Sequence, residues 1–508
     1  MRTTVAVMST LVLSWALSAP VAIAAEGASQ APEGNSKSPL LEASGRAGRL
    51  TASLETRISA EQVSAIPVDA SGASFEAGAL LRSRIRPGLV WSTERTIAPF
   101  FAKVELEADL HEGTFYDEPT LFGPGYPGTD DAEMSVRKAA LTLSVGGLLN
   151  VTGGYLTSHW GLGLMANDGA HGWKPGSANF THEVGGDRVL RAMVSTSPIP
   201  GMGLMAAAAY DVVQHDDAML EGDEASQWVG ALVYGMGKPN TAGVYVVSRY
   251  QESAAGAETE VVAIDAMGMG ELPLGNMKLH LAAEVATVFG GTKLGPNAVY
   301  PEHDIFSVGA VVKAGLQLER WGVWLDTAYA SGDQNADDGQ VNAFKADPNF
   351  QQGLLLHRYI MAAQTARAPH TASNPDLVGV PADDLDRIPT RGAFTNTVSV
   401  FPRIWWRPVP TLELYGGALI ALSPASVSDP LESRLAGGVP TNALGGDPGS
   451  YLGAELDAGV RWNMNLEGLH LGAAFEAALF LPGDAFVDPA GNAPDPVSGA
   501  RFTLTGRL

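Results

Sequence analysis

Apolar and polar residues alternate along most of this chain with a period of two. The clearest stretch is Ala102–Leu110, where Lys103, Glu105, Glu107 and Asp109 take every second position between apolar residues. Successive side chains of a β-strand point to opposite faces, so this segment has one apolar and one charged face. This pattern is typical of an all-β fold, a transmembrane antiparallel up-and-down β-barrel with lipid outside and water inside.

The alternation predicts about 18 strands, within limits of 16 and 20. They span residues 49–59, 79–89, 97–110, 134–146, 150–158, 187–197, 203–213, 226–236, 241–251, 259–267, 276–289, 305–318, 321–330, 394–406, 411–421, 452–462, 467–480 and 499–508. Short connections alternate with long ones, as expected for short periplasmic turns and long external loops. With 49–59 as a strand, both termini of the chain lie on the periplasmic side, which requires an even number of strands.

The long connection 331–392 contains a segment that does not alternate. Residues 353–363 are Ala-rich and apolar on every side, which predicts a short helix buried at the barrel mouth or in the lumen. An extra hairpin, giving 20 strands, is the competing interpretation.

The N-terminal residues indicate export. Residues 1–24 combine Arg2, an apolar core and the small-residue pattern Ala22-Ile23-Ala24, which predicts a signal peptide; a membrane anchor is the alternative. Residues 25–46 are rich in Ala, Ser, Gly, Pro and Glu and predict a disordered periplasmic leader. The barrel domain is expected over 47–508.

Composition supports an outer-membrane protein. Hydrophobic residues make up 45% of the chain and charged residues 17%, with no cysteine, yet no later stretch of 18 apolar residues could form a membrane helix. The net charge of −23 argues against nucleic acid as a partner. The expected partners are outer-membrane lipid and lipopolysaccharide, the barrel assembly machinery and a small hydrophilic solute.

Charged residues on the predicted inner face are the candidates for pore lining. They are Arg82, Arg84, Arg86, Lys103, Glu105, Glu107, Asp109, Lys278, Glu284, Asp326, Arg403, Glu413, Glu455, Asp457, Arg461 and Arg501. Opposed cationic and anionic walls would select solutes by charge. The alternative is that these residues form structural ion pairs between neighbouring strands.

Aromatic residues near the predicted strand ends suggest interfacial girdles. They are Trp91, Trp228, Tyr234, Tyr245, Tyr250, Trp321, Tyr329, Trp406, Tyr415 and Trp462.

The connection 159–187 is rich in polar, aromatic and glycine residues and predicts a constriction loop entering the barrel. Its candidate residues are His159, Trp160, Asp168, His171, Trp173, His182 and Asp187. A plain surface loop and a metal site are the alternatives, but no ligand spacing on a periodic segment indicates a metal. We therefore expect no metal and no cofactor.

No catalytic motif occurs: the chain has neither G-x-S-x-G nor H-E-x-x-H. We therefore expect a protein that is not an enzyme. A hydrolase whose catalytic residues come from separate strands, and a plugged structural or adhesion barrel, are the alternatives.

The chain resembles Gram-negative outer-membrane barrels of the porin-like class over residues 49–508. Its last strand, Ala500–Leu508, resembles their C-terminal assembly signal, although Leu508 stands where the class usually has an aromatic residue. A further resemblance, to alginate-export-type barrels, rests on Trp160–Gly163, Gly186–Arg188 and Asp347–Phe350. The resemblance implies a channel for passive passage of small hydrophilic solutes, narrowed by inward loops.

Overall fold

A computed structural model describes most of the chain. The described residues are 41–45, 48–70, 72, 74–75, 80–93, 100–112, 133–171, 174–180, 186–199, 203–216, 218–219, 222–236, 238–294, 300–334, 338–365, 392–437 and 439–508. The predicted signal peptide lies outside them.

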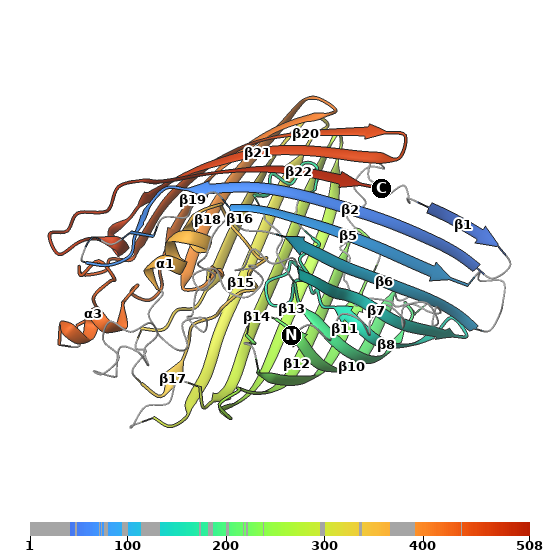
Figure 1. Ribbon diagram of the computed structural model, residues 1–508, viewed down its shortest axis with the longest axis horizontal. Helices are drawn as coiled ribbons and strands as arrows, with labels where there is room; N and C mark the ends of the chain where they lie inside the picture. Colours follow the sequence, from blue (N-terminus) through green and yellow to red (C-terminus); the bar gives the residue numbers. More distant parts are fainter. Residues whose placement is uncertain are drawn as a thin grey trace, which may run out of the picture.

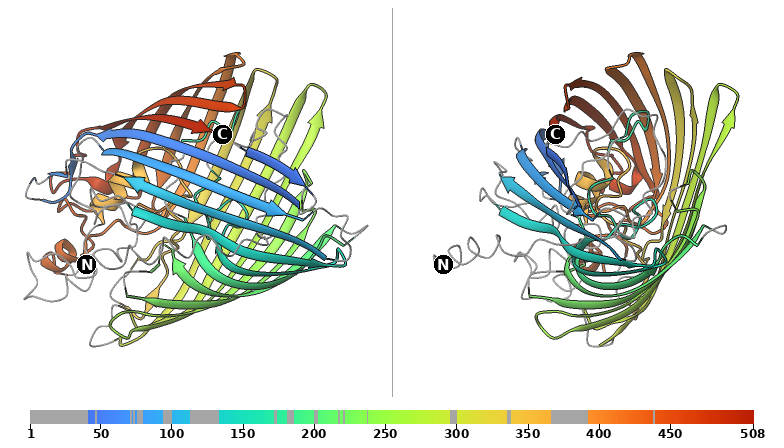
Figure 2. Two further views of the ribbon diagram at one scale, coloured as in Figure 1. Left: turned by 45° about the vertical axis from the view of Figure 1, so that its right-hand side comes forward. Right: turned by 90° about the vertical axis from the view of Figure 1, so that its right-hand side faces the viewer.

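The dominant element is one closed sheet, antiparallel apart from one short added strand (Figures 1 and 2). It contains 20 strands, of which β1 (Leu41–Gly45) and β17 (Gln340–Val341) are short additions, so 18 form the barrel. These are β2 (Gly48–Val63), β5 (Leu80–Ser92), β6 (Phe100–Glu112), β7 (Glu133–Val145), β8 (Leu149–Thr157), β9 (Arg188–Thr196), β10 (Leu204–His215), β11 (Glu224–Tyr234), β12 (Thr241–Glu252), β13 (Glu258–Leu274), β14 (Met277–Thr292), β15 (His303–Gln317), β16 (Trp321–Ala330), β18 (Thr397–Val409), β19 (Leu412–Leu422), β20 (Tyr451–Leu466), β21 (Leu469–Pro482) and β22 (Val497–Arg507). The predicted fold class and strand number are confirmed.

The barrel closes through β2. This strand pairs with β5 from Arg49 to Glu61 and with the last strand, β22, from Glu55 to Val63. Leu54 and Leu508 exchange backbone hydrogen bonds of 3.0 and 2.9 Å, which continues the seam to the final residue. The closed sheet leaves no open edge along this seam. An open edge would expose unpaired backbone N–H and C=O groups to lipid, which is costly.

Several short elements decorate the sheet. They are β1 (Leu41–Gly45), β3 (Ile66–Pro67), β4 (Ser74–Phe75), β17 (Gln340–Val341), the helical turns η2 (Leu356–Met361), α1 (Ala362–Gln364), α3 (Pro430–Leu435) and η5 (Asp484–Phe486). β1 pairs with the start of β2, so the prediction of a disordered leader is wrong for Leu41–Gly45. The rest of that leader lies outside the described residues. In Figure 1, β17 and α3 lie at the left, among the long loops, and β1 lies at the opposite end.

The two faces of the barrel wall differ as the alternation predicts. In β18, Thr397, Ser399, Phe401, Arg403 and Trp405 are buried inside, and the residues between them face outward. Exposed apolar side chains recur at every second position of the other strands, which forms an outer belt. The inner face is not uniformly polar, because Phe401 and Trp405 contact loops that fold inward.

Two aromatic predictions are wrong. Tyr245 and Tyr415 are only 6% and 5% exposed and face the interior, where Tyr245 stacks on Trp160 and the Tyr415 hydroxyl donates to Glu476 at 2.5 Å. Trp228, Tyr234 and other aromatic residues of the predicted set are exposed on the outer face.

The helix predicted at 353–363 is present and begins three residues later. Both Tyr359 and Ile360 donate backbone N–H groups to the Leu355 carbonyl, at 3.0 and 3.2 Å, which widens η2 into a π-helical turn that continues into α1. All residues of both turns are buried. The described residues contain no extra hairpin here, and the 18-strand barrel excludes the 20-strand alternative. Among the described helices, none is long and apolar enough to span a membrane.

The outer belt generates a prediction about stability. Val285, near the middle of β14, is 48% exposed on the outer face. We expect Val285→Arg to lower the free energy of unfolding in lipid vesicles by about 2–4 kcal/mol, because the guanidinium would sit in hydrocarbon. Urea titration followed by tryptophan fluorescence measures this change. The control is Leu435→Arg, because Leu435 is 70% exposed on α3 among the long loops; an equal loss in both variants would contradict the lipid-facing assignment.

Candidate functional site: the loop that crosses the lumen

The segment 158–187, which we name the crossing loop, leaves the wall after β8 and returns at β9. Its two ends meet where the Ser158 N–H donates to the Asp187 carbonyl at 3.1 Å. Between them the loop reaches other strands: the Trp160 indole N–H donates to Asp265 of β13 at 2.9 Å. The Trp324 indole of β16 donates to the Gly176 carbonyl at 2.7 Å. The loop therefore extends inward across the lumen; that it constricts a pore stays a prediction.

Wall carboxylates accept hydrogen bonds from the backbone of the crossing loop. Glu284 of β14 accepts from the N–H groups of Leu162 and Leu164, the latter at 3.1 Å. Glu413 of β19 accepts from the Gly176 N–H at 2.9 Å. A buried N–H without a partner is costly, so these carboxylates stabilise the loop inside the barrel.

Gly161 explains why the loop can approach Glu284 so closely. Its φ is +57°, in the left-handed region, and a Cβ there would lie 2.4 Å from the Glu284 carboxylate. Only glycine fits both requirements. The glycines of this loop predicted tight folding. Gly161 is needed because it lets the loop contact the wall.

Wall arginines donate to the far side of the same loop. Arg403 of β18 donates to the carbonyls of Ser177 and Ala178 at 3.1 and 3.2 Å. The Arg461 and Arg501 guanidinium groups of β20 and β22 donate to the carbonyls of Asn179 and Phe180 at 3.3 and 2.9 Å, respectively. The crossing loop is thus held between carboxylates and guanidinium groups from well-separated strands.

A second inward segment, 342–365, packs on the crossing loop and on the wall. The Asp347 N–H donates to the Leu164 carbonyl at 2.9 Å, and the Asp347 carboxylate accepts from Asn167 N–H at 3.2 Å. At the start of η2, Glu455 of β20 accepts from the N–H groups of Leu354, Leu355 and Leu356 at 2.5, 2.9 and 2.8 Å. A carboxylate in this place satisfies the unpaired donors of a helix start.

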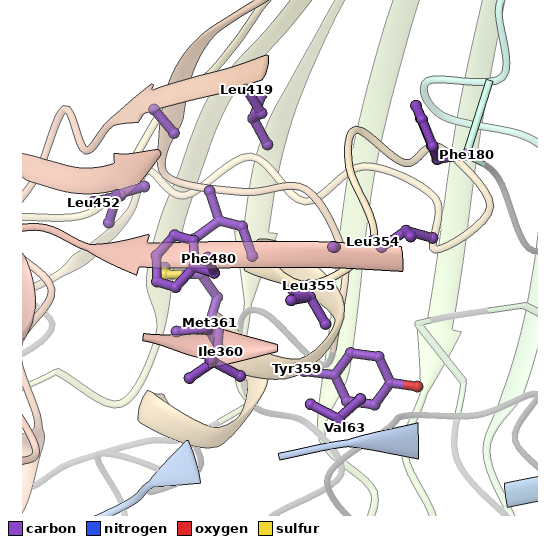
Figure 3. Packing of buried hydrophobic residues seen from close by; sticks show 14 of the residues in the cluster. Val63, Phe180, Leu354, Leu355, Tyr359, Ile360, Met361, Leu419, Leu452 and Phe480 are labelled. Carbon is purple, nitrogen blue, oxygen red and sulfur yellow. The ribbon is translucent and has the colours of Figure 1, made fainter. Parts of the chain in front are cut away.

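The apolar side of this segment covers one part of the inner wall. Leu355, Ile360 and Met361 pack with Leu419, Leu452 and Phe480 of β19, β20 and β21 (Figure 3). The cluster also includes Val63 of β2 and Phe180 of the crossing loop. The interior next to β18–β22 and β2 is therefore filled by side chains.

Many inner charges also pair with charges on neighbouring strands. Arg86 binds Asp109 through two contacts of 2.5 and 2.8 Å. Asp326 lies 2.6 Å from Arg403, and Glu476 lies 2.6 Å from Arg501. For these residues the geometry favours the alternative interpretation, structural ion pairs between strands.

A cavity of about 250 Å³ remains beside the crossing loop. Residues from β12 to β16, β18, the crossing loop and segment 342–365 line it. The polar or charged side chains among them are His159, Asn167, His171, Lys174, Ser177, Asn179, Thr241, Glu271, His280, Lys313, Asn349, Gln351, Asp326 and Arg403. Four predicted site residues reach this cavity: Asp326, Arg403, His159 and His171.

The other predicted pore-lining residues lie elsewhere on the inner side of the wall. Arg82, Arg84, Arg86, Asp109, Glu284, Glu413, Glu455, Asp457, Arg461 and Arg501 are buried. Lys103, Glu105 and Glu107 are partly exposed, and Lys103 pairs with Glu105. Lys278 is 51% exposed at the side chain, beside the turn between β13 and β14. Their roles in the passage of solutes stay predictions.

The other predicted constriction residues lie at different places along the crossing loop. Trp160 is 1% exposed and holds the loop to β13, and Asp168 is buried. Asp187 is half-buried where the loop returns to the wall. Trp173 and His182 lie outside the described residues.

Sequence reasoning missed Glu271 and His280, which line the cavity. His280 has the same strand parity as Glu284, so extending the alternation along β14 would have found it. Glu271 lies beyond the predicted end of its strand at residue 267, because β13 continues to Leu274.

The Glu284 contacts generate a prediction about the loop. We expect Glu284→Ala to speed amide exchange across residues 160–167, because it leaves two N–H groups without their acceptor, at about 1–3 kcal/mol each. Glu284→Gln keeps one acceptor oxygen and should give an intermediate rate. Hydrogen–deuterium exchange of the folded protein measures both, with Glu302→Ala in an exposed loop as the control. Unchanged exchange in Glu284→Ala would refute the role of this carboxylate.

Comparison with known proteins shows the fold but no family. No family model and no curated protein matches the chain. The crystal structure of Pseudomonas aeruginosa OccK9 (OpdG) is similar with a TM-score of 0.51 at 11% identity, over 90% of this chain and 98% of that chain. The outer membrane protein OpdK and OccK5 (OpdH) of the same organism give TM-scores of 0.49 and 0.48 at 11% and 12% identity, with the same coverage. The predicted resemblance to a porin-like barrel is confirmed at the level of the fold.

Proposed function

We propose that this protein is an outer-membrane channel for passive passage of small hydrophilic solutes, and that it is not an enzyme. One observation carries the proposal: a loop is held across the lumen by wall charges, and a polar cavity of about 250 Å³ lies beside it. An 18-strand barrel is wide enough for an aqueous channel unless loops fill it. The described loops leave this cavity open.

The largest apolar cluster and the cavity lie against different strands of the wall. This cluster packs on β18–β22 and β2, and the cavity is lined mainly by β12–β16, with β18 at the boundary. Two further clusters pack the crossing loop and segment 342–365 onto β9–β16, so the described loops narrow this side as well. The cavity that remains supports a narrowed lumen in place of a plugged one.

The charges around the cavity suggest a preference among solutes. Its cationic residues are Lys174, Lys313 and Arg403, and its acidic residues are Glu271 and Asp326. Counted without the histidines, this set has one more positive than negative charge. A narrow, water-filled path amplifies such a difference because its walls have a low dielectric constant. We propose that the channel favours anions over cations.

The outer surface supports placement in the outer membrane of a Gram-negative cell. The belt of exposed apolar strand residues would contact lipid, and OpdK, with a similar barrel, is an outer membrane protein. Lipopolysaccharide around the long loops and the barrel assembly machinery are the proposed partners.

The first test is conductance. We expect the refolded protein to give stable single-channel steps in a planar bilayer, because water should fill the cavity beside the crossing loop. Heat-modifiable gel mobility confirms folding in the same sample. A folded protein that gives no steps would refute the channel and favour the plugged-barrel alternative.

The second test concerns charge. Lys313→Glu changes the charge of the cavity wall by two units, so we expect the reversal potential in a salt gradient to shift toward cation preference. Lys293→Glu is the matched control, because Lys293 is half-exposed in a loop after β14, where it pairs with Glu258 at 2.5 Å. Equal reversal potentials in the two variants would show that the cavity is not on the ion path.

A further inference from the structure

Two histidines and one carboxylate of the crossing loop converge, although the sequence separates them by up to twelve residues. They are His159, Asp168 and His171, and one potential ligand atom of each lies within 4.8 Å of the others. His171 Nδ1 is 2.8 Å from Asp168 Oδ1, and His159 Nδ1 is 4.0 Å from the same oxygen. The two imidazole rings stack with centroids 3.6 Å apart.

One nitrogen of this cluster is buried without a hydrogen-bond partner. His159 is 9% exposed, and its Nδ1 makes no hydrogen bond. A buried polar atom usually has a partner, so an unsatisfied one needs an explanation. This nitrogen lies near both Asp168 and the second imidazole, so a bound cation would satisfy it.

The three side chains are of the types that bind a cation. Metal ions bind the neutral form of an imidazole and the ionised form of a carboxylate. His159, His171 and Asp168 supply two imidazoles and one carboxylate at this point of the loop.

Further hydrogen bonds orient the Asp168 carboxylate. Thr157 Oγ1 donates to Asp168 Oδ2 at 3.2 Å, and the Ala170 N–H donates to Oδ1 at 3.0 Å. Such outer contacts orient metal ligands in known sites. Arg137 lies 3.9 Å from Asp168, but it also pairs with Glu107 at 3.0 Å, which offsets its charge.

The cluster is open to water on one side. His159 and His171 both line the cavity beside the crossing loop, and the His171 side chain is 24% exposed. An ion can therefore reach the site from the lumen, and water can occupy a remaining coordination position.

We propose that His159, Asp168 and His171 form a binding site for a divalent transition-metal ion of the Zn²⁺ class in the wall of the lumen. Two imidazoles and one carboxylate match the ligands that such ions prefer, whereas Ca²⁺ and Mg²⁺ prefer oxygen-only sites. The shifts needed are small, because the ion enters between atoms that are already 2.8 and 4.0 Å apart. The site does not depend on whether the barrel conducts.

The test is direct binding to the refolded full chain without a histidine tag. Co²⁺ serves as the probe, because its visible absorption reports nitrogen and oxygen ligands, and Zn²⁺ competes for the site. We expect one ion per chain, and at least about tenfold weaker binding in His159→Ala and in His171→Gln. The glutamine in His171→Gln can still hydrogen-bond to Asp168 and so support the loop. Weaker Co²⁺ binding by this variant would therefore show that His171 coordinates the ion.

His280→Ala is the matched control. His280 lines the same cavity and lies 3.2 Å from Glu271, but no third ligand joins that pair among the described residues. We expect its binding to equal that of the unsubstituted protein. The proposal is overturned if Co²⁺ shows no saturable binding, or if His159→Ala and His171→Gln bind as tightly as His280→Ala while gel mobility shows folded barrels. Conductance with a chelator present tests the channel separately.

Discussion

The architecture of the lumen depends on one requirement: a backbone that leaves the wall must still find partners for its N–H and C=O groups. The crossing loop and segment 342–365 obtain them from charged strand side chains. Glu284, Glu413 and Glu455 accept from loop N–H groups, and Arg403 and Arg501 donate to loop carbonyls. Bonds with a charged partner are about twice as strong as neutral ones. The wall charges thus decide where the loops lie and which part of the lumen stays hollow.

This use of charge changes how the inner face is interpreted. A carboxylate that already accepts two or three loop N–H groups, as Glu284 and Glu455 do, has little capacity left for a passing solute. Arg86 is similarly occupied by Asp109. Under the proposed function, selectivity would come from groups that reach the cavity, such as Lys313 and His171. A row of charges on one strand face indicates a lumen, but not which charges face the solute.

The period of two was sufficient to predict the barrel, because it follows from strand geometry alone. It was ambiguous where both faces are apolar: in β12, Val244 and Val246 face outward and Tyr245 and Val247 inward, so the aromatic prediction for Tyr245 was wrong. The period of two could not predict contacts between loops and distant strands. Trp160 and Asp265 are 105 residues apart, and no local pattern encodes their hydrogen bond.

The charge of the whole chain differs from the charge of the cavity wall. The chain has a net charge of −23, yet the described cavity wall has three cationic and two acidic residues. Inside the barrel an unpaired charge is expensive, and many buried carboxylates meet a guanidinium or loop N–H groups, as Glu476 and Glu455 do. Asp457 is also buried, and its two oxygens have no hydrogen-bond partner among the described residues. The net charge of the chain therefore does not predict the charge around the cavity, and under the proposed function the cavity would decide which ions pass.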